Sequence, residues 1–233
     1  MDQGKDCPYL RLMEDWYVKE MAEKIMEGKC ILFVGSGVSV GRGKEKGKGC
    51  PSAKGFSKEL AKSLKESKGY SLPHNLDLMK TAQYYEMFRG REELVRKIKE
   101  KFWGKKPLIA HENIAKLPFK VIFTTNYDDL IEKSLESKCC PVKYGKFPQW
   151  DEDKVVLVKM HGSADDIDHG SADDIDIERI MERRLVISVD DYVDFIGKNS
   201  FVKDALKFYF KTKNSFLLAI ASLTSTSLSY TKR

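Results

Sequence analysis

The chain opens with a helical pattern that changes abruptly to a strand pattern. Between Tyr9 and Glu27, apolar side chains recur every three or four residues, which predicts an amphipathic helix. The next stretch, "CILFVG", is apolar at every position before its glycine, as is typical of a short strand buried on both faces of a parallel sheet. We therefore expect an N-terminal helix over residues 1–28, followed by an α/β domain over residues 29–233.

A long helical stretch separates this strand from the next one. The segment "GRGKEKGKG" comes first; it has no apolar residue and four glycines, which predicts a mobile loop. Helical spacing then runs through "FSKELAKSLKES", "DLMKTAQYYEMF", "REELVRKIKEKFW" and "HENIAKL", with Ser57 as a candidate N-cap. These segments contain no strand pattern, so we expect a helical insert over about residues 57–118.

Four more apolar runs predict further strands. They are Val121 to Phe123, "DKVVLVKM", "RRLVISV" and "NSFLLAIAS". Helices are predicted after the first run, beginning with acidic residues, and after the third, beginning at Asp190 or Asp191. Strands that alternate with helices in this way indicate an α/β fold with a Rossmann-like, doubly wound parallel sheet.

Composition narrows the class of protein. The chain of 233 residues is 42% hydrophobic and 33% charged, as expected for a globular protein, and its apolar runs are too short to span a bilayer. We expect a cytoplasmic protein. The formal charge of +6 comes from lysines scattered among glutamates, which gives no clear nucleic-acid site. The five cysteines form no C-x-x-C pair, which argues against a zinc site.

Polar residues follow three of the predicted strands at the point where each strand ends. The segments are Gly35 to Ser39, Thr124 to Asp128, and His161 to Ser163. Because ligands bind outside the carboxyl ends of the strands in an open parallel sheet, we expect these segments to converge on one crevice.

Each segment also has a structural interpretation. "GSG" is either an ordinary tight turn or a phosphate-binding turn. Helix capping accounts for Asp128 but does not explain why Asn126 should face the carboxyl edge. His161 is either a surface histidine in a loop or a general base that titrates near neutral pH.

Taken together, "FVGSGVS", "FTTNYDDLIEKSL", "VKMHGS" and "LVISVDDY" resemble the sirtuin superfamily. They look most like the bacterial and archaeal sirtuin-like domains associated with antiphage NAD depletion. The resemblance extends from about Cys30 to the C-terminus and includes "GCPS", whose proline is Pro51. It implies NAD as the ligand, with Asn126 positioning a nucleophile and His161 acting as the base. It also implies cofactor contacts from Gly35, Ser36, Gly37, Ser39, Pro51, Thr125, Asp128, Gly162 and Ser163, and no metal.

The resemblance implies cleavage of the bond between nicotinamide and ribose, as in an NAD⁺ glycohydrolase of a prokaryotic defence type. The first alternative is a non-catalytic module that binds NAD or ADP-ribose, or regulates a partner. A protein deacylase is a further alternative, but the four zinc cysteines that deacylating sirtuins usually carry are missing. A defence partner protein or a homo-oligomer would fit the same resemblance.

Besides the missing zinc cysteines, two features depart from the family pattern. The octet "HGSADDID" occurs twice, beginning at His161 and again at His169. Because His161 follows its strand directly, we expect it to be the base and His169 to be a passenger. The C-terminus also lacks the family's "I-G-Y-S-L-[ST]-D" segment. A frameshift near Phe216 or Leu217 would explain this and would leave the C-terminal strand region incomplete.

Overall fold

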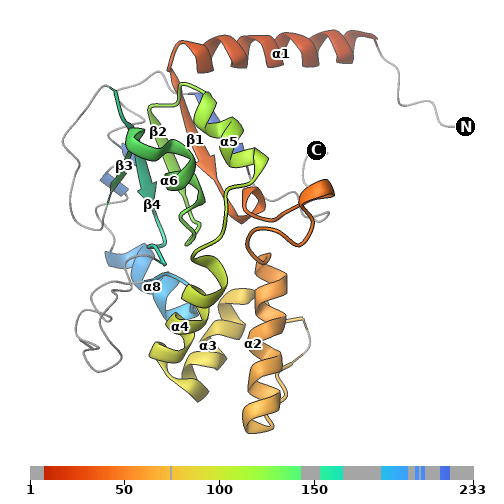
Figure 1. The fold of residues 1–233 in the computed structure, drawn as a ribbon, viewed down its shortest axis with the longest axis vertical. Helices are drawn as coiled ribbons and strands as arrows, with labels where there is room; N and C mark the ends of the chain where they lie inside the picture. Colours follow the sequence, from red (N-terminus) through yellow and green to blue (C-terminus); the bar gives the residue numbers. More distant parts are fainter. Residues whose placement is uncertain are drawn as a thin grey trace, which may run out of the picture.

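The computed structural model describes residues 8–73, 75–142, 153–164, 185–198, 203–204, 206–207 and 216–220. These residues contain one five-stranded sheet, with the order β3 (Cys139–Val142), β4 (Val155–Lys159), β2 (Val121–Thr124), β1 (Cys30–Val34) and β5 (Phe216–Ile220). All neighbouring strands are parallel. The predicted α/β class with a Rossmann-like parallel sheet is confirmed (Figure 1).

The central strands are apolar up to their last residues because both of their faces are covered. On one face, Leu32, Ile122 and Leu157 form a buried cluster with side chains from helices on that side. On the other face, Ile31 and its neighbours on β2 and β4 form a second buried cluster. This arrangement explains why the strands read as continuous apolar runs instead of alternating ones.

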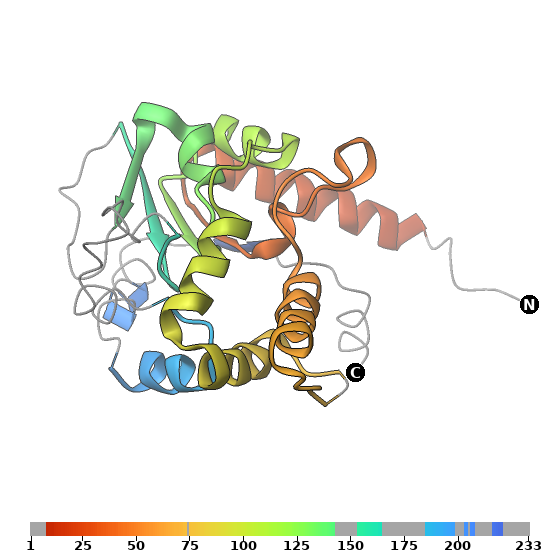
Figure 2. The ribbon, with the colours of Figure 1, turned by 60° about the horizontal axis from the view of Figure 1, so that its bottom comes forward.

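The helices divide into those that flank the sheet and those that form the insert. α1 (Pro8–Met26), α5 (Ile109–Lys116) and α6 (Leu130–Leu135) each contribute to the cluster around Leu32. The insert consists of α2 (Ala53–Lys68), α3 (Leu78–Arg89) and α4 (Arg91–Phe102), which lie beyond the carboxyl ends of the strands (Figure 1). α3 packs against α2, α4 and α8 (Val189–Lys198) (Figure 2). None of the described helices is long and apolar enough to cross a bilayer.

The start of the insert differs from the sequence prediction. α2 begins at Ala53, and its N-cap is Ser52, whose hydroxyl accepts a hydrogen bond from the Gly55 N–H at 3.1 Å. Ser57 lies inside the helix, and its hydroxyl contacts Thr81 Oγ1 at 2.8 Å. The prediction of Ser57 as the cap was therefore wrong.

Two other segments also differ from their predicted form, and the predicted loop contains a short helix. The glycine-rich loop forms the 3₁₀ helix η2 (Gly43–Glu45), enclosed by an antiparallel bridge between Val40 and Gly49. Residues 185–188, predicted as a strand, form no ladder in the described structure. β3 was not predicted, because it carries two cysteines and a proline on a partly exposed edge strand; the 3₁₀ helix η3 (Glu136–Lys138) leads into it.

Two of the sequence predictions fall on residues that the structure does not describe. Residues 165–184 hold most of the doubled octet, including His169, and residues 221–233 hold most of the segment that motivated the frameshift hypothesis. Both lie outside the described residues.

Candidate functional site

The carboxyl ends of β1, β2 and β4 bring the three predicted polar segments to one edge of the sheet. Val34 on β1 is in register with Thr124 on β2, which is in register with Lys159 on β4. Beyond the strands, the Thr125 N–H donates to Val34 O at 3.3 Å and the Met160 N–H donates to Thr124 O at 2.8 Å. β1 has β2 on one side and β5 on the other, so its carboxyl end lies where the strand order changes direction, which is the usual place for a ligand crevice.

The turn after β1 is tight, and it buries Ser39. Gly35 is extended, with φ of −108° and ψ of 179°, so it does not use the positive φ that glycine allows. The 3₁₀ helix η1 (Ser36–Val38) follows, and the Ser39 N–H donates to Ser36 O at 3.1 Å. Ser39 is 1% exposed. The turn thus carries Gly35, Ser36 and Gly37 past the end of β1 and delivers a buried hydroxyl to the edge.

The glycine-rich loop returns to Ser39 at its end. The Cys50 N–H donates to Ser39 O at 2.8 Å. The preceding residue, Gly49, has φ of +81°, and a Cβ at that position would lie 2.4 Å from Ser39 O. Pro51 follows and is half-buried directly before α2. Gly49 is therefore required for the close approach that fixes the Ser39 backbone.

Asn126 is held from two sides. Its backbone N–H donates to Thr124 Oγ1 at 3.0 Å, and that hydroxyl donates to Val34 O at 3.0 Å. Its side-chain Nδ2 donates to Ser39 Oγ at 3.0 Å. Asn126 is 4% exposed, and within the described structure its Oδ1 is buried without a hydrogen-bond partner. Because a buried polar atom without a partner is costly, Oδ1 is the acceptor that a ligand or water would satisfy.

A residue that the sequence did not single out completes this arrangement. His111, in the first turn of α5, places its Nε2 3.2 Å from Ser39 Oγ. In the sequence, His111 lies in an ordinary helical stretch of apolar and charged residues. The histidine itself is the only feature that could have marked this position as functional. The contact with Ser39 spans 72 positions of the chain and could not be inferred from spacing.

A buried lysine on β4 also holds the turn that carries Asn126. Lys159 Nζ donates to Asp128 O at 2.5 Å and to Glu132 Oε1 at 2.8 Å, and its side chain is 6% exposed. Burial raises the pKa of Glu132 in spite of this lysine. Asp128 itself is buried, and its Oδ1 accepts from the Leu130 N–H at 3.2 Å. The N-cap of α6 is Asp129, whose side chain makes no capping hydrogen bond, so the expectation that Asp128 caps this helix was wrong.

His161 lies just beyond β4 and packs among aromatic rings. Its ring meets Tyr192 and Phe195 of α8 edge-on, with centroids 5.3 and 5.5 Å away. Burial lowers the pKa of His161 to about 4, so the imidazole is neutral at pH 7. No hydrogen bond joins it to Asn126 among the described contacts, although the two residues follow neighbouring strands.

The remaining predicted residues are at the same edge. Gly162 has φ of +82°, which turns the chain after His161, and Ser163 is buried. The Ala164 N–H then donates to Tyr127 O at 2.8 Å. Thr125 is half-buried beside the end of β1.

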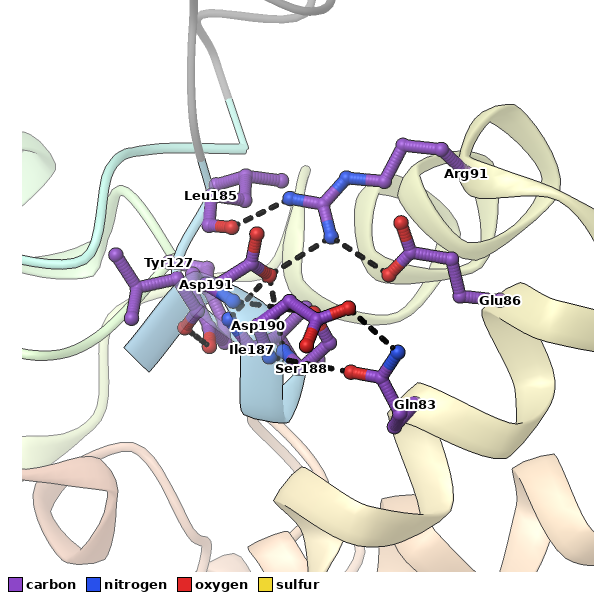
Figure 3. A network of polar contacts seen from close by, with 10 residues as sticks. Gln83, Glu86, Arg91, Tyr127, Leu185, Ile187, Ser188, Asp190 and Asp191 are labelled. Carbon is purple, nitrogen blue, oxygen red and sulfur yellow. Dashed lines mark hydrogen bonds and ion pairs between the residues drawn. The ribbon is translucent and has the colours of Figure 1, made fainter. Parts of the chain in front are cut away.

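Residues 185–188 link the edge to the helical insert. The Val186 N–H donates to His161 O at 3.0 Å, and Val186 O accepts from the Tyr127 hydroxyl at 2.6 Å. Arg91 of α4 reaches this segment: it donates to Leu185 O at 2.5 Å and to Asp191 Oδ2 at 2.8 Å (Figure 3). The insert therefore holds the segment that contacts both His161 and Tyr127.

Gln83 of α3 adds a second connection at the start of α8. Its Nε2 donates to Asp190 Oδ2 at 3.0 Å, and its Oε1 accepts from the Asp190 N–H at 3.2 Å (Figure 3).

Among the described residues, no group of three or more histidine, cysteine or acidic side chains is arranged to hold a metal ion.

Comparison with known proteins identifies relatives for much of the chain. Residues 120–230 match the SIR2-like domain family. The chain is 34% identical over 161 residues to the NAD(+) hydrolase ThsA of Acinetobacter baumannii (strain 532279), covering 66% of this chain and 30% of that protein. It is 30% identical over 196 residues to the NAD(+) hydrolase ThsA of Cytobacillus dafuensis, covering 82% of this chain and 35% of that protein.

A third relative gives the same result. The NAD(+) hydrolase ThsA of Bacillus cereus (strain MSX-D12) is 32% identical over 158 residues, which cover 64% of this chain and 31% of that protein. The matches thus span about a third of the length of the curated relatives. The resemblance drawn from the sequence motifs is confirmed.

Proposed function

We propose, on the premise that residues 120–230 belong to the SIR2-like domain family, that this chain hydrolyses NAD⁺ to nicotinamide and ADP-ribose. One observation carries the proposal: Asn126 Oδ1 is a buried acceptor without a partner in the described structure, at the carboxyl edge where a parallel sheet binds nucleotides. That acceptor is suited to hold a water molecule or a ribose hydroxyl. The names of three relatives, all NAD(+) hydrolases, support the same substrate.

The reaction requires an oriented nucleophile more than a strong one. The water oxygen forms a bond to C1′ of the ribose while the bond from C1′ to the pyridinium nitrogen breaks. The electron pair of that bond passes to the nitrogen, which leaves as neutral nicotinamide, and the water gives up one proton. Because the leaving group is cationic and the transition state resembles an oxocarbenium ion, orientation by Asn126 and exclusion of bulk water contribute most of the acceleration.

In this proposal His161 accepts the proton late in the reaction. A neutral imidazole can accept a proton, but a pKa of about 4 makes it a weak base in the free protein. Water becomes strongly acidic once its oxygen has begun to bond to C1′, so a weak base suffices at that stage. The edge-on rings of Tyr192 and Phe195 cover part of the half-buried imidazole.

The other residues of the edge would bind the rest of NAD⁺. We assign the diphosphate to the turn of Gly35, Ser36 and Gly37, which follows β1 at the change of strand direction. Thr125 and Asp128 would lie beside the nicotinamide ribose. Pro51, Gly162 and Ser163 would shape the walls of the crevice.

The low pKa of His161 favours a second candidate, a module that binds NAD⁺ or ADP-ribose without cleaving the substrate. Such a module would use the same edge and the same Asn126 acceptor. A role in antiphage defence, with a partner protein or a second copy of the chain, is a prediction that the resemblance implies for either candidate.

The two candidates differ in the release of nicotinamide. Purified protein is incubated with NAD⁺, free nicotinamide is followed by chromatography, and ADP-ribose binding is measured by calorimetry. The hydrolase predicts release by the wild type, with a large loss in His161→Ala and little change in His169→Ala. Binding of ADP-ribose without release of nicotinamide would support the module instead, and the absence of both would contradict the proposed site.

A further inference from the structure

His111 is buried at the N-terminal end of α5 and makes hydrogen bonds with both ring nitrogens. It is 1% exposed. The Leu108 N–H donates to its Nδ1 at 3.1 Å, and its Nε2 lies 3.2 Å from Ser39 Oγ. A ring nitrogen that accepts a backbone N–H carries no proton. In the neutral ring the proton is therefore on Nε2, which must be the donor to Ser39.

The environment of the ring keeps it neutral. Burial lowers the pKa of His111, and the carboxylates of Asp128 and Glu45 oppose this shift without overcoming it. Glu45 is itself engaged at the start of α5, where its Oε1 accepts from the Ile109 N–H at 3.0 Å. The tautomer is thus set by a backbone contact on one side and maintained by burial on the other.

The contact with His111 holds the Ser39 hydroxyl in place beside Asn126. Ser39 Oγ accepts from His111 Nε2 and also from Asn126 Nδ2 at 3.0 Å. In the structure two donors, His111 Nε2–H and the Asn126 NH₂ group, thus converge on Ser39 Oγ, and the Asn126 Oδ1 makes no hydrogen bond to this hydroxyl. This is the orientation in which Oδ1 is left without a partner in the described structure.

We propose that His111 is a positioning residue that acts through Ser39 to fix the orientation of the Asn126 side chain, so that Oδ1 is the acceptor offered to the substrate. The proposal rests on the hydrolase function for its effect on rate. The orientation of the amide itself does not depend on that function, and it can be observed without substrate.

Two substitutions separate the two contacts of the ring. In His111→Asn, the side-chain oxygen can replace Nδ1 as the acceptor for Leu108, but nothing reaches Ser39. In His111→Gln, the longer amide can place a donor near the position of Nε2, while the Leu108 contact is lost. If His111 were only a structural cap for α5, Asn would be the better replacement; if it positions Ser39, Gln would be.

The activity test compares these variants with Ser39→Ala and with the double variant His111→Asn/Ser39→Ala. Asn113→Ala, on the exposed side of the same helix, is the matched control. We expect His111→Asn to lower kcat by about 10- to 100-fold, with KM within about 3-fold of the wild type, and His111→Gln to recover most of the loss. The double variant should be no slower than Ser39→Ala. The proposal would be overturned if the losses in His111→Asn and Ser39→Ala were additive in the double variant. It would also be overturned if His111→Asn were more active than His111→Gln.

A second measurement does not depend on catalysis. Side-chain amide NMR with selectively ¹⁵N-labelled asparagine follows the Asn126 NH₂ group, which is assigned by its absence in Asn126→Ala. We expect a single, slowly exchanging NH₂ pair in the wild type and in His111→Gln, and a shifted or broadened pair in His111→Asn. An unchanged pair in His111→Asn would refute the positioning role. Wild type that shows the expected NMR pattern but no nicotinamide release would contradict only the hydrolase function.

Discussion

Arg91 should be among the most sensitive positions outside the candidate site. Its guanidinium contacts Asp191 Oδ2 at 2.8 Å, Glu86 Oε2 at 3.1 Å and Leu185 O at 2.5 Å (Figure 3). Its side chain is 21% exposed and that of Asp191 is 14% exposed, so these contacts are only partly screened by solvent. Replacing Arg91 by Met would keep most of the packing and remove the charge.

The expected loss of stability follows from the groups that Arg91→Met leaves without their partner. Arg91→Met leaves two carboxylates close together without their cation, and it leaves Leu185 O without this donor. Removing one partner of a fully buried pair costs about 3–5 kcal/mol, and partial exposure reduces that figure. We expect a loss of about 2–3 kcal/mol in the free energy of unfolding, and a smaller loss for Arg91→Lys, which keeps the charge but not the forked geometry.

Urea unfolding followed by circular dichroism measures this loss, with Arg96→Met as the matched control. Arg96 is in the same helix and pairs with Glu93 at 2.6 Å, but its side chain is 63% exposed, so its loss should cost less than about 0.5 kcal/mol. Arg91→Met should also lower nicotinamide release, because residues 185–188 contact His161 and Tyr127. Equal stability of the two variants would show that the partly buried contacts of Arg91 contribute no more than the exposed pair of Arg96.

Three further predictions concern the edge of the sheet. Gly49→Ala should be less stable and less active than Gly47→Ala, because both positions have positive φ but only at Gly49 would the new Cβ clash with Ser39 O; thermal melting and nicotinamide release test this. Lys159→Met should lose about 3 kcal/mol in urea unfolding, and adding Glu132→Gln should recover part of the loss, because the uncompensated buried carboxylate is then gone. His161→Phe should flatten the dependence of stability on pH between about 6.5 and 4.

The sign of the His161 effect follows from its lowered pKa. The unfolded chain binds a proton at this residue near pH 6.5, whereas the folded protein binds it only near pH 4, so the wild type loses stability as pH falls through this window. The loss is at most about 3 kcal/mol. A wild type and a His161→Phe variant with parallel pH profiles would contradict the burial of a neutral imidazole. Equal stability of Gly49→Ala and Gly47→Ala would contradict the close approach at Gly49. If Glu132→Gln recovered none of the stability lost in Lys159→Met, the pairing of Lys159 with Glu132 would not account for that loss.

The sequence was sufficient to predict the parallel sheet and the three segments at its carboxyl edge. β1, β2 and β4 are covered on both faces, so their positions are apolar except for Thr124 and Lys159 at the ends of β2 and β4, and polar segments follow all three strands. The same argument failed for residues 185–188, where an apolar run fills a space between the insert and the edge without joining a ladder. It also missed β3, an edge strand with only one fully buried position.

The supporting residues of the candidate site could not be predicted, because their roles arise from contacts between distant segments. His111, Lys159 and Arg91 each occur in stretches where a polar side chain at helical or strand spacing is unremarkable. Their partners lie 72, 31 and 100 positions away along the chain. Periodicity describes which face a residue occupies, but it does not identify the group opposite.

Replacing Asn126 tests the proposed hydrolysis of NAD⁺ at the carboxyl edge of the sheet. Nicotinamide release and ADP-ribose binding are measured for the wild type, Asn126→Ala and the control Asn113→Ala, whose asparagine is exposed on α5. If Oδ1 orients the nucleophile, Asn126→Ala should lower the rate of release by at least about 100-fold while the Kd for ADP-ribose changes by less than about 5-fold. Asn113→Ala should match the wild type in both. Release of nicotinamide by Asn126→Ala at the wild-type rate would contradict the role of Oδ1 in orienting the nucleophile.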